Sequence, residues 1–583
     1  MARRSIRGGT SASKVLVNLV AVGAASLLAL AACDGGGTNA PTEPSSLADC
    51  KTEPLTCNSG TTQPGGTVTY TIEKVITGWN LNHADSNTFD FAEVLGGVLA
   101  GGPFVVPPDF NVVENPDYVE SVDVVSTDPM VIEYTLNTDA VWNDGSPVGI
   151  DDFDYAWKTL NGKDCPSCEA ASTAGYEQIE SLEANGNVIT ATFTDPYADW
   201  KGLFGGLYPA HVAAQHGDLS TPDGLYAAFT WFNGADNVPD YSAGPYIITD
   251  YDKDVSVTLE PNDRWWGEVK PSLDKLVFRI ITEQAQEVPA LQSKEVNVIY
   301  PQPNQDIVDA VKGIADVSYV SSQGLTWEHL DLNTANPLLA DKALRSAIFT
   351  AVDREDIIAK TVGQFTEGLK PLGSHNFVPG QAGYKDLITD SGQGAGDVDA
   401  AKQILTDAGY TGVGTDLKTP DGTDVSLRFG FTQGNTLREQ TGALVQGYLR
   451  ALGIDVQLAP FASLGGTLGS GDYDIIIFAW VGGPFPYGGA IQLWGSESES
   501  NYNHFTSTES DELLQQAATE SDSATADGLL NQSDEILTAD AVVLPLFQKP
   551  TFLAAYNNIV NIRDNASNAA PVYNVQEWGI RAT

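Results

Sequence analysis

The chain has 583 residues and carries 76 Asp and Glu against 30 Lys and Arg, a formal net charge of −46 at pH 7. So negative a field excludes general binding to nucleic acid, whose phosphates are also negative, and indicates a well-solvated surface. The length exceeds what one hydrophobic core usually supports, so we expect two lobes, one of them subdivided.

The beginning of the chain is typical of an export signal. Basic residues without any acid precede an apolar stretch, Val15 to Leu30, which is shorter than the ~20 residues that a spanning helix needs. The stretch ends in Leu-Ala-Ala-Cys, with the cysteine at position 33, and this motif resembles the lipobox of bacterial lipoproteins. The resemblance implies that residues 1–32 are removed and that lipid on Cys33 anchors an extracytoplasmic protein to the cell membrane. The alternative is an ordinary cleaved signal peptide with an incidental cysteine.

Residues 33–64 are rich in Gly, Thr, Pro and Ser and show no apolar periodicity. Such a composition cannot bury a core, so we expect a flexible tether. The folded part is then expected to begin near Gly65.

The remaining cysteines indicate disulfides. Without Cys33 their number is even, and exported proteins fold in an oxidising compartment. We expect two short-range bonds, Cys50 with Cys57 and Cys165 with Cys168. The second pair could instead form a redox motif or half of a metal site, but its polar surroundings and the lack of a second CxxC favour a structural disulfide.

Strand and helix patterns interchange along the rest of the chain. Val68, Tyr70 and Ile72 alternate with polar residues, which predicts a half-buried strand. An Asp-Gly turn at 144–145 is followed by a helix that Asp151 or Asp152 can cap. Apolar residues at three- and four-residue spacing predict helices over 341–354, 398–408 and 437–452. Alternating apolar and polar residues predict a strand over 454–458. The mixture predicts an α/β protein with mixed sheets.

Several short motifs occur in an informative order. The most specific is Ala-Val-Trp-Asn-Asp-Gly-Ser-Pro-Val at 140–148, followed by Asp-Phe-Asp-Tyr-Ala at 152–156. The chain thereby resembles the extracytoplasmic solute-binding proteins of peptide and nickel ABC importers, the oligopeptide- and dipeptide-binding family, roughly from residue 66 to 560. Other matching motifs begin at Gly244, Asn262, Ala290, Leu344, Ala408, Leu452, Tyr473 and Leu544.

The resemblance implies a fold, a two-lobed periplasmic-binding-protein-like clamp that closes on its ligand. Lobe I would hold residues 65–315 plus 550–583, with an inserted subdomain at about 110–230, and lobe II would hold 316–549. Because the chain crosses between lobes twice, Tyr300–Tyr319 and Leu544–Pro550 are the candidate hinges.

The resemblance also implies a function. The chain would be the lipid-anchored receptor of an ABC importer, a monomer that binds a peptide or peptide-like solute and delivers it to a permease powered by a cytoplasmic ATPase. The alternative is a non-transport envelope lipoprotein that uses the same fold for regulation or glycolipid-related binding. Gly78-Trp79-Asn80 is similar to the corresponding segment of actinobacterial relatives linked to mannosylated phosphatidylinositol.

Aromatic residues in cleft loops are the candidate ligand contacts, because rings add contact area around backbone hydrogen bonds to a solute. Each of them could instead be a core residue. The candidates are Trp79, Asn80, Trp327, Trp480, Phe485 and Tyr487.

One expected family feature is missing. In peptide binders, the loop after the strand that ends here in Trp480 carries an Asp that pairs with the peptide's α-amino group. In this chain Val481, Gly482 and Gly483 follow, and no acid appears before Glu497. A buried ammonium without a carboxylate costs several kcal/mol. The ligand would therefore lack a free amino terminus, or another loop would supply the acid, with Asp85 as one substitute.

No pattern indicates catalysis, a metal or a cofactor. The six histidines include His211 and His216, whose spacing places them on different sides of a helix. The sequence contains no HExxH, GxSxG or GxxxxGK[ST] motif. We therefore expect a binding protein and not an enzyme.

Overall fold

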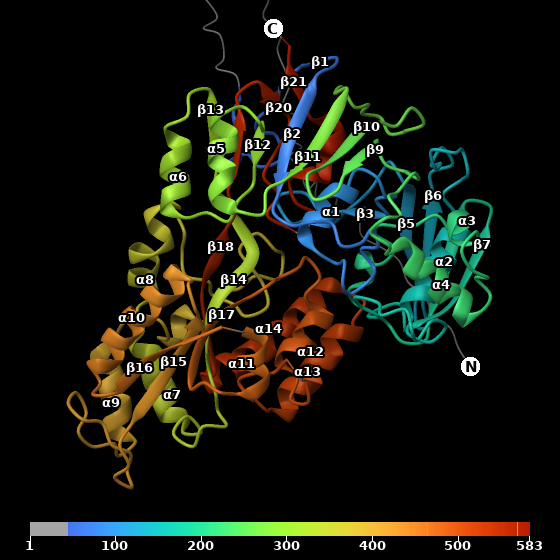
Figure 1. Ribbon diagram of the computed structural model, residues 1–583. Helices are drawn as coiled ribbons and strands as arrows, with labels where there is room; N and C mark the ends of the chain where they lie inside the picture. Colours follow the sequence, from blue (N-terminus) through green and yellow to red (C-terminus); the bar gives the residue numbers. More distant parts are fainter. Residues whose placement is uncertain (1–44, 463, 499, 568, 583) are drawn as a thin grey trace, which may run out of the picture. The chain divides into compact units, whose positions relative to one another are not determined.

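The computed structural model describes residues 45–462, 464–498, 500–567 and 569–582, which belong to one unit (Figure 1). Cys33 and the signal peptide expected at 1–32 lie outside these residues. The described part contains two large mixed sheets, a four-stranded antiparallel sheet and two small sheets, and this confirms the predicted α/β class. None of its helices is both long and apolar enough to cross a membrane.

The first large sheet combines strands from distant parts of the chain. β2 lies at its centre between the parallel strands β11 and β12, and Val68, Tyr70 and Ile72 of β2 are buried. β19, from near the end of the chain, lies between β12 and β13. The strands are β2 (Thr67–Ile72), β9 (Tyr246–Asp252), β10 (Ser256–Pro261), β11 (Lys275–Ile280), β12 (Val298–Ile299), β13 (Val317–Val320) and β19 (Leu553–Tyr556). Helices between them in sequence include α1 (Phe89–Leu95), η3 (Gln284–Gln286), α5 (Glu287–Gln292) and α6 (Gln305–Lys312).

The second large sheet has the order β16-β15-β17-β14-β18, in which β15 is parallel to β16 and β17 whereas β14 is antiparallel to β17 and β18. Its strands are β14 (Gln323–Leu332), β15 (Ser426–Thr432), β16 (Asp455–Phe461), β17 (Ile475–Trp480) and β18 (Val543–Pro550). Its α-helices are α7 (Lys342–Ala351), α8 (Arg354–Lys360), α9 (Val398–Asp407), α10 (Thr436–Arg450), α11 (Leu464–Ser470), α12 (Tyr487–Trp494), α13 (Thr508–Thr519) and α14 (Ser523–Asp540), with 3₁₀ turns η4 (Val362–Gln364) and η5 (Thr389–Ser391).

Local capping explains why several of these helices begin where the sequence predicts. Asp341 precedes α7 and accepts a hydrogen bond from the Ala343 N–H at 2.9 Å. Asp397 caps α9 in the same way, through the Ala400 N–H. A carboxylate at this position satisfies an N–H group that has no partner inside the helix, and it favours the helix by about 1 kcal/mol.

The four-stranded sheet has the order β5-β6-β8-β7 and lies between β2 and β9 in sequence. Asp152 connects its surroundings, because it accepts hydrogen bonds from the Trp142 indole, the Gly149 N–H and the Ala210 N–H. Cys165 and Cys168 form a disulfide nearby. The elements are β3 (Phe104–Val105), β4 (Val113–Glu114), β5 (Val119–Thr127), β6 (Met130–Leu136), α2 (Ile150–Leu160), β7 (Ile179–Asn185), β8 (Val188–Phe193), η2 (Trp200–Gly202), α3 (Ala210–Ala213) and α4 (Pro222–Phe232).

The tether predicted for residues 33–64 is wrong over its described part, because the folded structure begins at Leu47 and not near Gly65. Leu47, Cys50 and Cys57 are buried, and the two cysteines form the second disulfide. The Cys57 carbonyl accepts a hydrogen bond from the Arg563 side chain at 3.1 Å. Contacts with the C-terminal segment, which local composition does not reveal, order this stretch. The elements involved are η1 (Leu47–Lys51), β1 (Thr62–Gln63), β20 (Ile559–Val560), η6 (Pro571–Glu577) and β21 (Gly579–Arg581), of which β1, β21 and β20 form one sheet.

The chain passes between the two large sheets twice. β13 leads into β14 through Ser321 and Ser322, and β18 leads into β19 through Thr551 and Phe552. The Thr551 N–H donates to the Ser322 carbonyl at 2.9 Å, so the two crossings are hydrogen-bonded to each other. Figure 1 shows β14 and β18 side by side where they leave the first sheet.

A buried ion pair fixes the region around the second sheet. Asp534 on α14 accepts hydrogen bonds from the Ser374 hydroxyl and the His375 N–H, and it pairs with the His375 ring. The other ring nitrogen of His375 faces the Val543 carbonyl at 3.1 Å, so both ring nitrogens have a polar partner. Burial opposes the charge on Asp534, but His375 and these donors hold the pKa of Asp534 below its ordinary value.

Asp534→Asn is expected to lower the free energy of unfolding by about 1–3 kcal/mol at pH 7, because it removes a buried carboxylate that accepts hydrogen bonds from Ser374 and His375. The stabilisation by Asp534 is present above the pKa of an unfolded Asp, near 4, and is lost as the pH falls through the lower folded value. Urea unfolding of both proteins at several pH values measures this difference. The exposed Asp250→Asn serves as the control, with a change within about 0.5 kcal/mol. Equal stability of the Asp534 variant and the wild type at pH 7 would contradict the expectation.

Candidate functional site

A cleft of about 670 Å³ lies where the two large sheets meet, a volume typical of ligand sites. One wall comes from the first sheet, with the end of β2, the residues that follow it and the beginning of α1. The other wall comes from the second sheet, with the beginning of β14, the loop after β17 and the end of β18. Both crossings therefore adjoin the same cleft.

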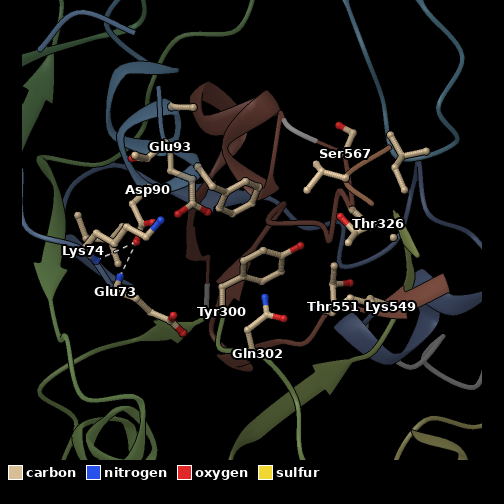
Figure 2. A pocket seen from close by; sticks show the side chains of 18 of the residues that line it. Glu73, Lys74, Asp90, Glu93, Tyr300, Gln302, Thr326, Lys549, Thr551 and Ser567 are labelled. Carbon is tan, nitrogen blue, oxygen red and sulfur yellow. Dashed lines mark hydrogen bonds between the residues drawn. The ribbon is translucent and has the colours of Figure 1, made fainter. Parts of the chain in front are cut away.

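Carboxyl groups gather on the first-sheet wall (Figure 2). Asp90, in the first turn of α1, accepts hydrogen bonds from the Glu73 N–H at 2.6 Å and the Lys74 N–H at 3.0 Å. Glu93 lies one turn further along α1, is only 3% exposed and accepts a hydrogen bond from the Tyr70 hydroxyl. The chain after β2 is thus bound to α1, and this brings three acidic side chains to one wall.

These carboxyl groups disfavour one another's charge. Burial raises the pKa of Glu93 well above its usual range, and the nearby Asp90 and Glu73 raise it further. Burial and Asp90 also raise the pKa of Glu73. Glu287, behind this wall, has its pKa raised to about 8, chiefly by burial and in addition by Glu73. Within the described part of the chain, no Lys, Arg or His comes within 4.0 Å of any of the four as an ion-pair partner.

The opposite side of the cleft carries a cation. Lys549, near the end of β18, lines the cleft together with Thr326, Thr551 and Ser567 (Figure 2). Burial lowers the pKa of Lys549, and Glu328 opposes that shift. The cleft therefore carries both signs of charge, with three acids and Lys74 on the first-sheet wall and Lys549 on the second-sheet wall.

Trp79 and Asn80 lie in the core and do not line this cleft. Trp79 is 1% exposed, its indole N–H donates to the Ala235 carbonyl at 3.0 Å, and its ring packs edge-on against Tyr251. The Asn80 side chain donates to the Phe229 carbonyl at 3.0 Å. Because their polar groups are bonded to the protein's own backbone, the structure corrects the expectation that these two residues face a ligand.

Trp327 and Trp480 are neighbours on the second sheet, where their strands pair. Trp327 is buried, and the half-buried Trp480 lies parallel to His329 on one side and to Tyr502 on the other. Neither indole lines the cleft, but the residues next to them in sequence do, Leu325 and Thr326 on β14 and Val481 and Gly482 after β17. The two segments predicted from the sequence thus reach the cleft, but their indole side chains do not line it.

Phe485 and Tyr487 belong to a contact across the molecule. Phe485 packs against Gly202, and the Tyr487 hydroxyl donates to Asp527 at 2.8 Å. Asp199, between β8 and α3, accepts hydrogen bonds from the Tyr487 N–H at 3.4 Å and the Gly488 N–H at 2.7 Å, at the beginning of α12. Burial raises the pKa of Asp199 to about 6. This contact joins the region of the four-stranded sheet to a helix that follows β17.

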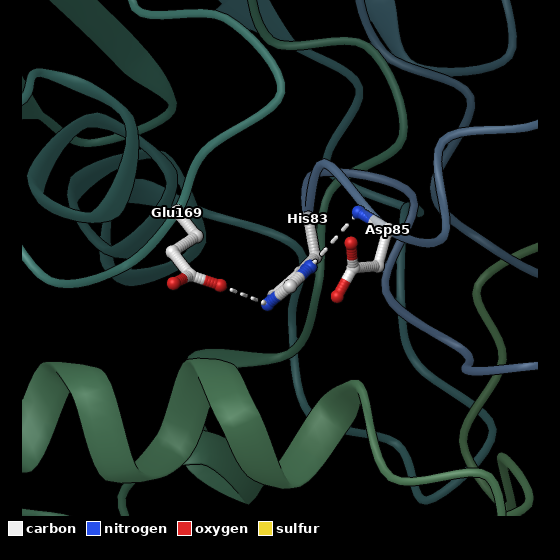
Figure 3. Close-up of side chains that lie close together, drawn as sticks. All are labelled: His83, Asp85 and Glu169. Carbon is white, nitrogen blue, oxygen red and sulfur yellow. Dashed lines mark hydrogen bonds and ion pairs between the residues drawn. The ribbon is translucent and has the colours of Figure 1, made fainter.

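Asp85, the substitute acid considered above, does not line the cleft but lies beside His83 and Glu169 (Figure 3), with one ligand-type atom of each residue within 4.8 Å of the others. Nδ1 of His83 accepts a hydrogen bond from the Asp85 N–H at 3.1 Å, and Nε2 faces Glu169 at 3.6 Å. A metal at Nε2 would require a hydrogen on Nδ1, where the Asp85 N–H already points. The three residues therefore fit a hydrogen-bonded group better than a metal site.

The acids of the cleft were not found from the sequence. Glu73 and Lys74 directly follow the predicted strand 68–72, a position at which strands commonly deliver ligand-binding residues. Asp90 and Glu93 gave no such signal, because their approach to Glu73 depends on how α1 packs.

Two mixed α/β sheets, joined by two crossings and enclosing a polar cleft, define a periplasmic-binding-protein fold. The model of the bacterial extracellular solute-binding proteins, family 5, matches residues 114–502, and the chain belongs to this family. Its members bind solutes for ABC transporters and are not enzymes, which confirms the family and class predicted from the motifs.

Relatives match nearly the whole chain. The oligopeptide-binding protein OppA of Mycobacterium tuberculosis H37Rv is 30% identical over 550 residues, 92% of this chain and 89% of its own. An uncharacterised lipoprotein of Mycobacterium leprae is 25% identical over 573 residues, 90% and 95% of the two chains. Among solved structures, the periplasmic EDTA-binding protein EppA is 37% identical with a TM-score of 0.83, covering 91% of this chain and 99% of EppA.

Proposed function

We propose that this chain is the receptor of an ABC importer that captures a peptide or peptide-like solute in the cleft between the two large sheets and delivers it to a membrane permease. The lining with both signs of charge carries this proposal, since a peptide bears positive and negative groups. The name of OppA points to the same ligand class. EDTA, the ligand in the name of EppA, is a polycarboxylate, and the wall around Glu93 offers it acids and a single cation, Lys74.

Capture proceeds by hinge closure of two lobes, residues 65–315 with 550–583 and residues 316–549. Two observations support this mechanism. The crossings at 321–322 and 551–552 are short, as hinges are, and they begin two residues and one residue after the ends of the ranges expected from the sequence. The contact of Asp199 with the beginning of α12 joins the two lobes away from the hinge, so it holds the closed form.

Lipid on Cys33 anchors the receptor outside the cell, beside the permease and its cytoplasmic ATPase, and the receptor acts as a monomer. The family is extracellular, and similar mycobacterial proteins are described as lipoproteins. An anchor raises the effective concentration of the receptor near its permease.

Native mass spectrometry of protein purified without denaturation is expected to show a retained peptide, because closed clamps release their solute slowly. The retained mass, fragmented in the gas phase, identifies its class. A glycolipid in place of a peptide would contradict the peptide proposal and favour a non-transport role in the envelope.

Cys33→Ser is expected to move the protein from the detergent phase to the aqueous phase in Triton X-114 extraction of the producing cells, because the thioether to the lipid is not formed. Cys50→Ser with Cys57→Ser keeps Cys33 and is the matched control, which should stay in the detergent phase. An unchanged partition of the Cys33 variant would contradict the lipid anchor.

Closure is expected to depend on pH through Asp199. The pKa of Asp199 is about 6 in the closed form and returns to its ordinary value near 4 when opening exposes it, so the closed form binds the proton more tightly. Lowering the pH from about 6 to 4 then favours closure by about 1.4 kcal/mol per unit. Distances between spin labels at Glu183 and Glu512, measured by pulsed electron resonance, report the two forms. Asp199→Asn should abolish this pH dependence, and an unchanged dependence in that variant would contradict the assignment.

A further inference from the structure

The wall of the cleft that follows β17 offers no charge to a ligand. Val481, which is 71% exposed, and Gly482 line it. A Cβ on Gly482 would lie 2.4 Å from the Leu325 carbonyl oxygen, so no side chain fits there without a shift of the backbone. An acid cannot simply be placed at this position, and a positively charged group in the cleft needs a partner elsewhere.

The opposite wall carries such partners. Asp90 and Glu93 approach Glu73 at the end of β2, and all three line the cleft (Figure 2). The backbone N–H groups that Asp90 binds occupy only one of its oxygens, and Glu93 is bound by a neutral tyrosine hydroxyl. Neither arrangement supplies a positive charge.

A second, independent feature lies behind this wall. Glu287 is 1% exposed, and one of its oxygens accepts from the Thr71 hydroxyl at 2.9 Å. Its other oxygen and one oxygen of Glu73 are buried and have no hydrogen-bond donor among the described residues except a proton held between the two carboxyl groups, while the Gln302 backbone N–H donates to the Glu73 carboxyl. Of these two acids only Glu73 lines the cleft, so a donor that arrives with the ligand can reach Glu73 and replace the shared proton there.

We propose that Glu73, Asp90 and Glu93 bind the ammonium group of the solute, so that the first sheet supplies the acid that the loop after β17 lacks. This inference rests on the proposed peptide-binding function and specifies its ligand class. An ammonium group has three N–H donors, which it can direct to the three acids that line this wall. It also favours the ionised form of Glu73 and Glu93, whose pKa values burial and neighbouring acids raise.

The ammonium group can come from the amino terminus of a peptide or from a lysine side chain, and the chemistry at the cleft is the same. Lys549 across the cleft would then face the negative part of the solute. The orientation of the bound peptide follows, with its positive end toward α1 and its negative end toward β18.

The test uses the purified protein after its retained solute has been removed by partial unfolding and refolding. Three mixtures of random pentapeptides without arginine are offered: free amino termini without lysine, acetylated amino termini without lysine, and acetylated amino termini with one lysine. Native mass spectrometry measures what is retained. We expect at least tenfold stronger retention of the first or the third mixture than of the second.

The outcomes separate the possible sources of the ammonium group. Retention of the first mixture assigns it to the amino terminus, and retention of the third assigns it to lysine. Equal retention of all three overturns the ammonium site but leaves peptide binding intact. Retention of none overturns the peptide-binding function and this inference with it.

Variants locate the site. Glu93→Gln and Glu73→Gln keep the shape of the side chain and remove its charge, so each should weaken binding of the preferred mixture at least tenfold and leave the acetylated, lysine-free mixture unaffected. Because each variant removes a like-charge neighbour, the empty protein should melt at the same or a higher temperature. Glu183→Gln, an exposed acid on β7, is the matched control with unchanged binding. Unchanged binding in both cleft variants would overturn the proposal.

Discussion

The rest of the architecture depends on the two strands that pass from one large sheet to the other. β14 and β18 pair with each other in the second sheet, and the segments before and after them enter the first sheet as β13 and β19. The hydrogen bond between Thr551 and Ser322 holds these crossings together. They place the ends of β14 and β18 opposite the end of β2, and that juxtaposition creates the cleft. A lysine on β18 thereby comes to face acids that follow β2, more than four hundred residues earlier in the chain.

Much of the secondary structure could be predicted because its causes are local. The helices α7, α9 and α10 begin within a residue or two of the positions that their capping residues and apolar spacing indicate. Cys50 pairs with Cys57 and Cys165 with Cys168, as short spacing suggests. The order in residues 45–64 could not be predicted, because it comes from the C-terminal segment. The partners of Asn58, for example, are the Ile559 and Ile562 carbonyl groups.

The binding site was harder to predict than the fold, for the same physical reason. Whether an aromatic ring faces a ligand or the core is decided by distant contacts, and the carbonyl that binds the Trp79 indole is on Ala235. An acid is equally ambiguous in a chain with 76 of them. Glu73, Asp90 and Glu93 differ from the others because they are crowded together on one wall of the cleft, a property that only the packing of α1 against the end of β2 reveals.

The placement of β19 has a consequence for the order of folding. This strand lies inside the first sheet, between β12 and β13, and β20 and β21 complete the small sheet with β1. Until the last thirty or so residues have emerged from the ribosome, β13 has no partner in the first sheet and the N-terminal segment has no sheet to join. Contacts between such distant parts of a chain form slowly. The first large sheet and the small sheet are therefore completed only after β19, β20 and β21 have been synthesised.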